Sequence, residues 1–175
     1  RLLGAIDDKG LALFAFAERC PSSEVRKEAI QQLGLLANRL TERRNYVGIK
    51  LTGLLAAAEK EPAFRAQILN LLTQPYVPVV REPDEVLVVR GYLEKGATPE
   101  LTDAELRDCA LVLGKAKTPE AKDALLRAAS SHAKLQARLY VLEEALVPWA
   151  RIDETIHLDL TQLALAPDQP LDARK

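Results

Sequence analysis

The segment that decides the fold is VRKEAIQQLG, at residues 25–34. Val25, Ala29 and Leu33 recur at intervals of four, which places the three side chains on one face of an α-helix. Arg26 follows the first of these apolar residues directly. The segment therefore predicts a helix that buries one apolar stripe and carries an arginine at the start of that stripe.

The same pairing of an apolar residue with arginine opens three further stripes along the chain. The four arginines are Arg26, Arg65, Arg107 and Arg138, with spacings of 39, 42 and 31 residues. Another helix and a short turn are expected before each stripe. The repeating unit is then a helical hairpin, and repeats of this length are typical of a solenoid, in which each unit buries its apolar face against its neighbours.

The composition supports a folded, all-helical protein. Leu and Ala, both strong helix formers, make up about a third of the 175 residues. Hydrophobic residues account for 48%, and the formal net charge is only −1. High apolar content with low net charge argues against disorder, and the lack of a basic excess argues against a chain that coats nucleic acid.

The periodicity predicts helices with short connections over almost the whole chain. The Val-rich segment 86–89 favours a strand by propensity, but PDE at residues 83–85 resembles a helix start, so a helix is expected there too. The expected helices are 9–19, 23–39, 43–60, 62–73, 84–95, 103–116, 119–131, 134–147 and 149–165.

Several of these helix ends carry recognisable chemistry. Thr102 and Glu105 have the spacing of a capping box, and Thr118 followed by Pro119 places an N-cap before a proline at the first helical position. Pro62 and Pro148 are expected to begin helices for the same reason. Gly96 is expected to end its helix in a left-handed turn.

One segment interrupts this organisation, the PYVPVVREP stretch at residues 75–83. Three prolines in nine residues favour extended chain. We expect either a surface loop packed against neighbouring helices or an exposed recognition loop that changes the curvature of the array. Residues 1–166 are expected to form one repeat domain that includes this loop, and residues 167–175 a polar tail.

These residues resemble HEAT repeats, an armadillo-like helical family, and in the second half the shorter HEAT-like repeats of phycobilin lyases. The resemblance rests on residues 25–34, on LRDCALVLG at 106–114, and on the following TPEA at 118–121; it extends over about 9–165. It implies a right-handed α-solenoid of about four hairpins plus a terminal helix. An up-down helical bundle is the alternative.

The resemblance also implies a role for the repeated arginines. In that family the arginine of the second helix pairs with an acid near the turn between the helices. Glu61 and Asp103 each precede such an arginine by four residues and are the candidates. The alternative is that the arginines only extend to solvent.

Signals for catalysis and for metal binding are poor. The two histidines, His132 and His157, have no metal-ligand spacing to each other or to a cysteine, so no metal and no cofactor are expected. Cys20 and Cys109 are expected to be buried, reduced thiols, because a free cysteine behaves as a small hydrophobic residue; a disulfide is the alternative. Trp149 and Asp153 stand four apart, expected on one face of the last helix, an arrangement similar to that of HEAT-like alkylpurine DNA glycosylases. However, residues 142–172 hold seven acids against one base, which would repel DNA. We expect no enzyme, no nucleic-acid partner, and Trp149 as a packing anchor.

These observations favour a non-catalytic scaffold module of a larger, cytoplasmic protein. No apolar run is long enough to span a membrane. The expected ligand is a peptide or protein surface on the concave face of the second helices, with Tyr140 as anchor. Alternatives are a regulatory or sensor segment packed on a catalytic domain, or a face covered by another domain of the same polypeptide. The expected partner-binding residues are Lys27, Gln31, Gln67, Asn70, Asp108, Gln136, Tyr140 and Glu144.

Overall fold

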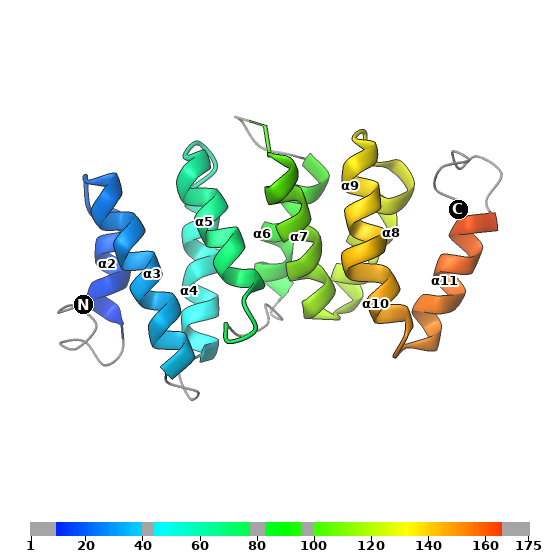
Figure 1. The fold of residues 1–175 in the computed structure, drawn as a ribbon, viewed down its shortest axis with the longest axis horizontal. Coiled ribbons are helices and arrows are strands. Elements are labelled where there is room, and N and C mark those ends of the chain that lie inside the picture. The colour runs from blue at the N-terminus through cyan, green and yellow to red at the C-terminus, as the bar shows by residue number, and fades with distance from the viewer. Residues whose placement is uncertain (1–9, 40–43, 78–82, 96–99, 166–175) are drawn as a thin grey trace. The chain divides into compact units, whose positions relative to one another are not determined.

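The computed structural model describes residues 10–39, 44–77, 83–95 and 100–165. All regular secondary structure in these ranges is helical, which confirms the all-α prediction (Figure 1). The elements are α2 (Leu11–Arg19), α3 (Ser23–Arg39), α4 (Arg44–Ala57), α5 (Pro62–Thr73), α6 (Pro83–Lys95), α7 (Asp103–Ala116), α8 (Pro119–Ser131), α9 (Leu135–Tyr140), the π-helix η2 (Val141–Leu146), α10 (Val147–Ala150) and α11 (Glu154–Leu165).

The chain divides into two compact units. The first comprises residues 1–80 and 97–99, and the second comprises residues 81–96 and 100–175. The boundary falls within the proline-rich segment 75–83. Val77 is buried in the first unit and Pro83 begins α6, while residues 78–82 lie outside the described part, as do Gly96 and the predicted tail.

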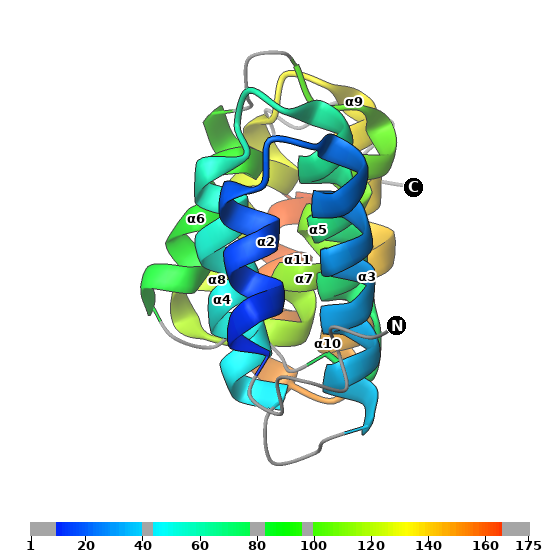
Figure 2. The same ribbon diagram turned by 90° about the vertical axis from the view of Figure 1, so that its left-hand side faces the viewer.

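The first unit has two layers of two helices. α2 and α4 form one layer, and α3 and α5 form the other (Figures 1 and 2). The predicted stripe on α3 is buried at Ala29 and Leu33, and Phe64 and Ile68 on α5 are buried as well. Val25, which begins the stripe, is 37% exposed, so the buried face begins one turn later than the sequence pattern indicates.

The second unit repeats the two-layer arrangement. α6 and α8 form one layer, and α7 forms the other together with the continuous helix α9–η2–α10 (Figure 2). Leu106, Ala110 and Leu113 of α7 are fully or almost fully buried, as are Ala137 and Val141. We call α2, α4, α6 and α8 the first helices of their hairpins, and α3, α5, α7 and α9–η2–α10 the second helices. α11 follows, packed on α10 and α8.

The predicted helix starts are confirmed where capping chemistry was specific. The Thr102 hydroxyl accepts from the Glu105 amide at 3.3 Å, and the Glu105 carboxylate accepts from the Thr102 amide at 2.8 Å. The Thr118 hydroxyl accepts from the Ala121 amide in the same way. Pro62 begins α5 as predicted, and residues 86–89 are helical.

The prediction at Pro148 is wrong. The chain does not start a new helix there but continues from Leu135 to Ala150, and the break falls at residues 151–153. A proline inside a helix removes one backbone hydrogen bond and crowds the carbonyl of the preceding turn. The π-helix η2 ends at Leu146, two residues before Pro148, and its i→i−5 hydrogen bonds give this turn a wider backbone.

Two glycines lie where the second helices contact each other inside each unit. A Cβ on Gly34 of α3 would stand 2.5 Å from the Leu71 side chain of α5. A Cβ on Gly114 of α7 would stand 2.8 Å from the Cβ and 2.9 Å from the Cα of Ala145 in η2. Both glycines end the segments that resemble HEAT repeats, and their missing side chains allow the neighbouring second helix to pack against them.

Candidate functional site

Four of the predicted partner-binding residues come together in the first unit. Lys27 and Gln31 lie on α3, Gln67 and Asn70 on α5, and all but the half-buried Gln67 are exposed. The Gln67 amide donates from Nε2 to the Lys27 carbonyl at 2.9 Å. Gln67 thus joins α3 to α5, and the other three side chains remain at the surface.

A shallow hollow of about 230 Å³ opens beside this group, between the starts of α3 and α5. Phe64 is buried there, and Arg26 lies over its ring at 4.0 Å from the centroid. Lys27 and Glu61 contribute charges of opposite sign. The hollow therefore has an apolar floor at Phe64 and a charged rim at Lys27 and Glu61. This combination suits a protein side chain that has an apolar stem and a polar end.

The repeated arginines mainly hold the turns between helices. Arg26 donates from Nε to the Ala17 carbonyl at 2.9 Å, Arg65 to the Glu59 carbonyl at 2.6 Å, and Arg138 to the His132 carbonyl at 2.6 Å. Each carbonyl belongs to the end of the preceding helix or to the turn after it, where backbone oxygens lack helical partners. Arg65 is fully buried, so the alternative that it extends to solvent is wrong.

The acid partners implied by the family resemblance need correction. Glu61 forms its ion pair with Arg26 of the preceding hairpin and not with Arg65, which stands four residues after it. No ion pair of Asp103 occurs among the described residues. Arg107 instead binds Glu144 of η2, with Nε to Oε1 at 2.7 Å. A pattern read along one helix could not find these pairs because they join residues 35 and 37 positions apart.

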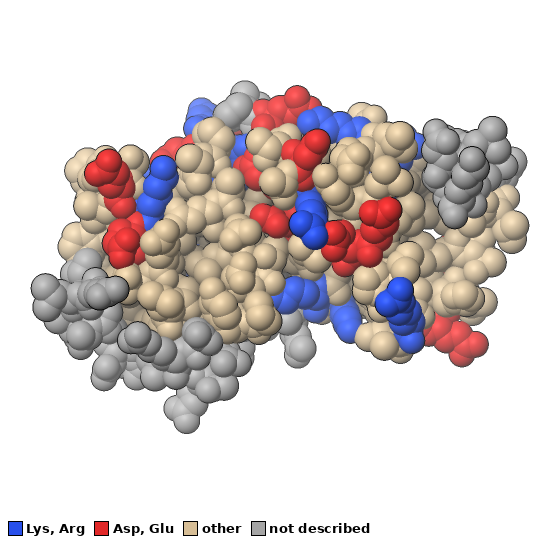
Figure 3. Space-filling model, in the orientation of Figure 1, with Lys and Arg blue, Asp and Glu red and all other residues tan. Residues whose placement is uncertain are grey.

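The other four predicted residues lie in the second unit, Asp108 on α7 and Gln136, Tyr140 and Glu144 on α9 and η2. Gln136 is exposed and the other three are half-buried. Glu144 is engaged by Arg107 and fixes η2 against α7. On the face of this unit that Figure 3 shows, acidic and basic side chains are interspersed and form no continuous band of either sign.

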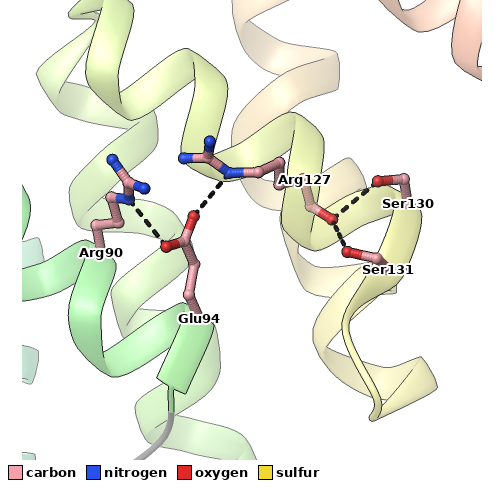
Figure 4. Close-up of polar contacts among 5 residues, drawn as sticks. All are labelled: Arg90, Glu94, Arg127, Ser130 and Ser131. Atoms are coloured by element: carbon pink, nitrogen blue, oxygen red, sulfur yellow. Dashed lines mark hydrogen bonds and ion pairs between the residues drawn. The ribbon is translucent and has the colours of Figure 1, made fainter.

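A charged cluster that the sequence analysis missed joins the two first helices of the second unit. Glu94 of α6 accepts from Arg90 and from Arg127 of α8, each at 2.9 Å, so that one carboxylate lies between two guanidinium groups (Figure 4). Partial burial works to raise the pKa of Glu94, but the hydrogen bonds from Arg90 and Arg127 outweigh it and hold the pKa below its ordinary value. The i,i+4 spacing of Arg90 and Glu94 was a visible signal, whereas Arg127 lies 33 positions away.

Trp149 and Asp153 are arranged differently from the prediction. They do not share a helix, because Trp149 lies in α10 and Asp153 precedes α11. The indole Nε1 donates to Asp153 at 3.2 Å, and the other carboxylate oxygen accepts from the Thr155 amide and hydroxyl. The Thr155 hydroxyl bond is the main cause that lowers the pKa of Asp153. Trp149 is only 6% exposed, so its ring packs inside the protein and is not presented to a base.

The remaining reactive side chains form no further cluster in the described part of the chain. His132 caps the end of α8, where its Nδ1 accepts from the Lys134 amide, and His157 is exposed on α11. Neither Cys20 nor Cys109 is in a disulfide; Cys20 is half-buried and Cys109 is fully buried. Among the described residues no group of His, Cys, Asp and Glu is arranged to hold a metal, and none of their helices is long and apolar enough to cross a bilayer.

Comparison with known proteins gave no relative for this chain. No family model matches it, and neither a curated protein nor a solved structure gives a match.

Proposed function

We propose that this chain is a HEAT-like α-solenoid that works as a non-catalytic interaction module and binds a peptide or protein surface on its second helices. In a solenoid the second helices line the concave side. The observation that supports the proposal best is the α3–α5 face of the first unit. It combines the apolar hollow at Phe64 with exposed Lys27 and Gln31, on a backbone fixed by Gln67 and by Arg26.

The arginine contacts explain why such a face would keep its shape. Arg26, Arg65 and Arg138 each fasten a second helix to the end of the helix before it. A surface fixed in this way loses little conformational freedom when a partner binds, which favours affinity. The mixture of amides and of charges of both signs suits a protein surface better than a phosphate backbone or a lipid.

The experiment is a comparison of captured proteins. The tagged chain is used as bait beside Lys27→Glu, which alters the first unit, and Tyr140→Ala, which alters the second. The matched control Asp123→Lys reverses an exposed charge on the first helix α8. We expect at least one protein to be recovered about tenfold less with Lys27→Glu or Tyr140→Ala, and normally with Asp123→Lys.

The same comparison defines what would overturn the proposal. All variants should keep the helical circular dichroism and the melting temperature of the parent, because the substituted side chains are not in the core. If no captured protein responds to either second-helix variant, or if Asp123→Lys has the same effect as they do, the second helices are not the binding face.

A further inference from the structure

The hollow between the starts of α3 and α5 holds one ion pair that is already satisfied. The Arg26 guanidinium pairs with Glu61, and its Nε donates to the Ala17 carbonyl at 2.9 Å. The same guanidinium lies over the Phe64 ring, and the Arg26 side chain is only 16% exposed. Arg26 and Glu61 neutralise each other, so this pair adds no net charge to the hollow.

Lys27 is the third charged residue that lines the hollow. Its side chain is exposed, and no carboxylate of the described residues pairs with its ammonium group. Glu24 and Glu28, the nearest acids along α3, do not line the hollow. Because Arg26 and Glu61 cancel, the hollow carries one positive charge, and that charge belongs to Lys27.

The floor of the hollow beside Lys27 is apolar. It consists of the buried Phe64 and of the exposed Pro62 and Ala63 at the start of α5. Gln67 donates to the Lys27 carbonyl at 2.9 Å, which fixes α5 against the backbone of α3 at this point. An apolar side chain that covers this floor removes apolar area from water, and the fixed backbone lowers the entropy cost of binding it.

A carboxylate is the anion that matches the charge on Lys27. It carries one negative charge and therefore neutralises the ammonium group. A phosphate monoester carries about −1.5 to −2 at pH 7 and would leave excess negative charge beside Glu61. A lysine or arginine of the partner would be repelled by Lys27, and the Glu61 carboxylate is already paired with Arg26.

We propose that the hollow binds an acidic segment of a partner protein. A large apolar side chain of that segment covers Phe64, and the carboxylate of a neighbouring Asp or Glu pairs with Lys27. This inference rests on the proposed function, because it names the chemistry of the ligand that the α3–α5 face takes.

The probe is a phage-displayed library of random peptides, selected on the full chain. The selected peptides are synthesised with a fluorescent label, and fluorescence anisotropy measures their Kd. We expect an Asp or Glu beside a large apolar residue in the selected sequences. Replacing that acid with its amide should weaken binding about fivefold, which corresponds to a partly exposed ion pair of about 1 kcal/mol.

Charge reversal on both sides tests the contact with Lys27. Lys27→Glu should weaken binding of the selected peptide by about tenfold or more. The same peptide with lysine in place of its acid should bind Lys27→Glu more tightly than it binds the parent chain. The matched control Lys95→Glu makes the same change of charge at an exposed position of α6 and should leave Kd unchanged.

A second pair of variants tests the apolar floor. Ala63→Trp places a large side chain in the hollow and should weaken binding by about tenfold or more. The matched control Ala56→Trp places the same side chain at an exposed position of the first helix α4 and should leave Kd unchanged. Both alanines are exposed, so both variants should keep the melting temperature of the parent chain.

Four outcomes would overturn the inference. The first is a set of peptides that respond to Lys27→Glu or Ala63→Trp but bind equally well without an acid, a result that leaves the proposed function standing. The second is no enriched peptide, or peptides that bind every variant as they bind the parent; the comparison of captured proteins then decides the proposed function separately.

The other two outcomes assign the hollow to a different ligand. Binding that tightens about tenfold when phosphoserine replaces the acid would assign it to a phosphorylated segment. Concentration-dependent dimerisation of the chain, measured by analytical ultracentrifugation and abolished by Lys27→Glu but not by Lys95→Glu, would assign it to a second copy of the chain.

Discussion

The contact between α7 and η2 allows a sharp test of the packing in the second unit. A Cβ at Gly114 would lie 2.8 Å from the Cβ and 2.9 Å from the Cα of Ala145, well inside the usual separation of about 3.5–4.0 Å between carbon atoms. Because one of these atoms belongs to the backbone, rotation of a side chain cannot relieve the overlap. α7 and η2 must move apart.

Gly91 provides the matched control. It lies inside α6 in the same unit, and no atom stands within 4 Å of the place where its Cβ would be. Replacing either glycine with alanine gains about 1 kcal/mol of helix propensity. At Gly114 overpacking costs about 1–3 kcal/mol as well. We therefore expect Gly91→Ala to raise the free energy of unfolding by about 1 kcal/mol. The free energy of unfolding of Gly114→Ala should be about 1–3 kcal/mol lower than that of Gly91→Ala.

Urea unfolding followed by circular dichroism measures both variants against the parent chain. The difference between the two alanine variants isolates the helix contact, because the propensity gain cancels. If Gly114→Ala is as stable as Gly91→Ala, the close approach of α7 and η2 is wrong, and so is the role assigned to Gly114.

Three other substitutions test interactions that hold the hairpins. Arg65→Met removes a buried donor to the Glu59 carbonyl, so urea unfolding should show a loss of about 1–3 kcal/mol; an unchanged midpoint would contradict the turn-holding role. Glu94→Gln should cost about 1 kcal/mol at pH 7, against no change for the exposed control Glu143→Gln. Because the pKa of Glu94 is lowered in the folded state, the stability that its carboxylate contributes is complete above the ordinary pKa of about 4.3. This stability is lost as the pH falls through the pKa of Glu94 in the folded protein. A difference in unfolding free energy between the parent chain and Glu94→Gln that stays constant from pH 7 down to pH 2 would refute this. Thr102→Ala should remove about 1 kcal/mol of stability through loss of the capping box, measured by thermal unfolding, and an unaltered melting temperature would argue against the cap.

The sequence was sufficient to predict features that neighbouring residues determine. The capping box at Thr102, the cap at Thr118 and the proline start at Pro62 each depend on contacts within one helical turn, and all three are confirmed. The stripes on α3 and α7 are buried as their periodicity predicts, apart from Val25.

Features that depend on contacts between helices could not be predicted in the same way. The choice of Arg26 as the partner of Glu61, and the place of Arg127 beside Glu94, follow from how the hairpins pack, and residue spacing carries no signal for either. Pro148 was misinterpreted because proline usually marks a helix start, whereas here the helix that contains the π-helix η2 continues through it.

The proposal that second helices bind a protein partner is tested most directly by site-specific photo-crosslinking in cells. A photoreactive amino acid replaces Gln31 or Gln136, both exposed on second helices, or Leu87 or Asp123, both exposed on first helices. We predict a discrete crosslinked protein from Gln31 or Gln136 that is absent from Leu87 and Asp123. Crosslinks that form only from the first-helix positions, or equally from all four, would contradict the proposed function.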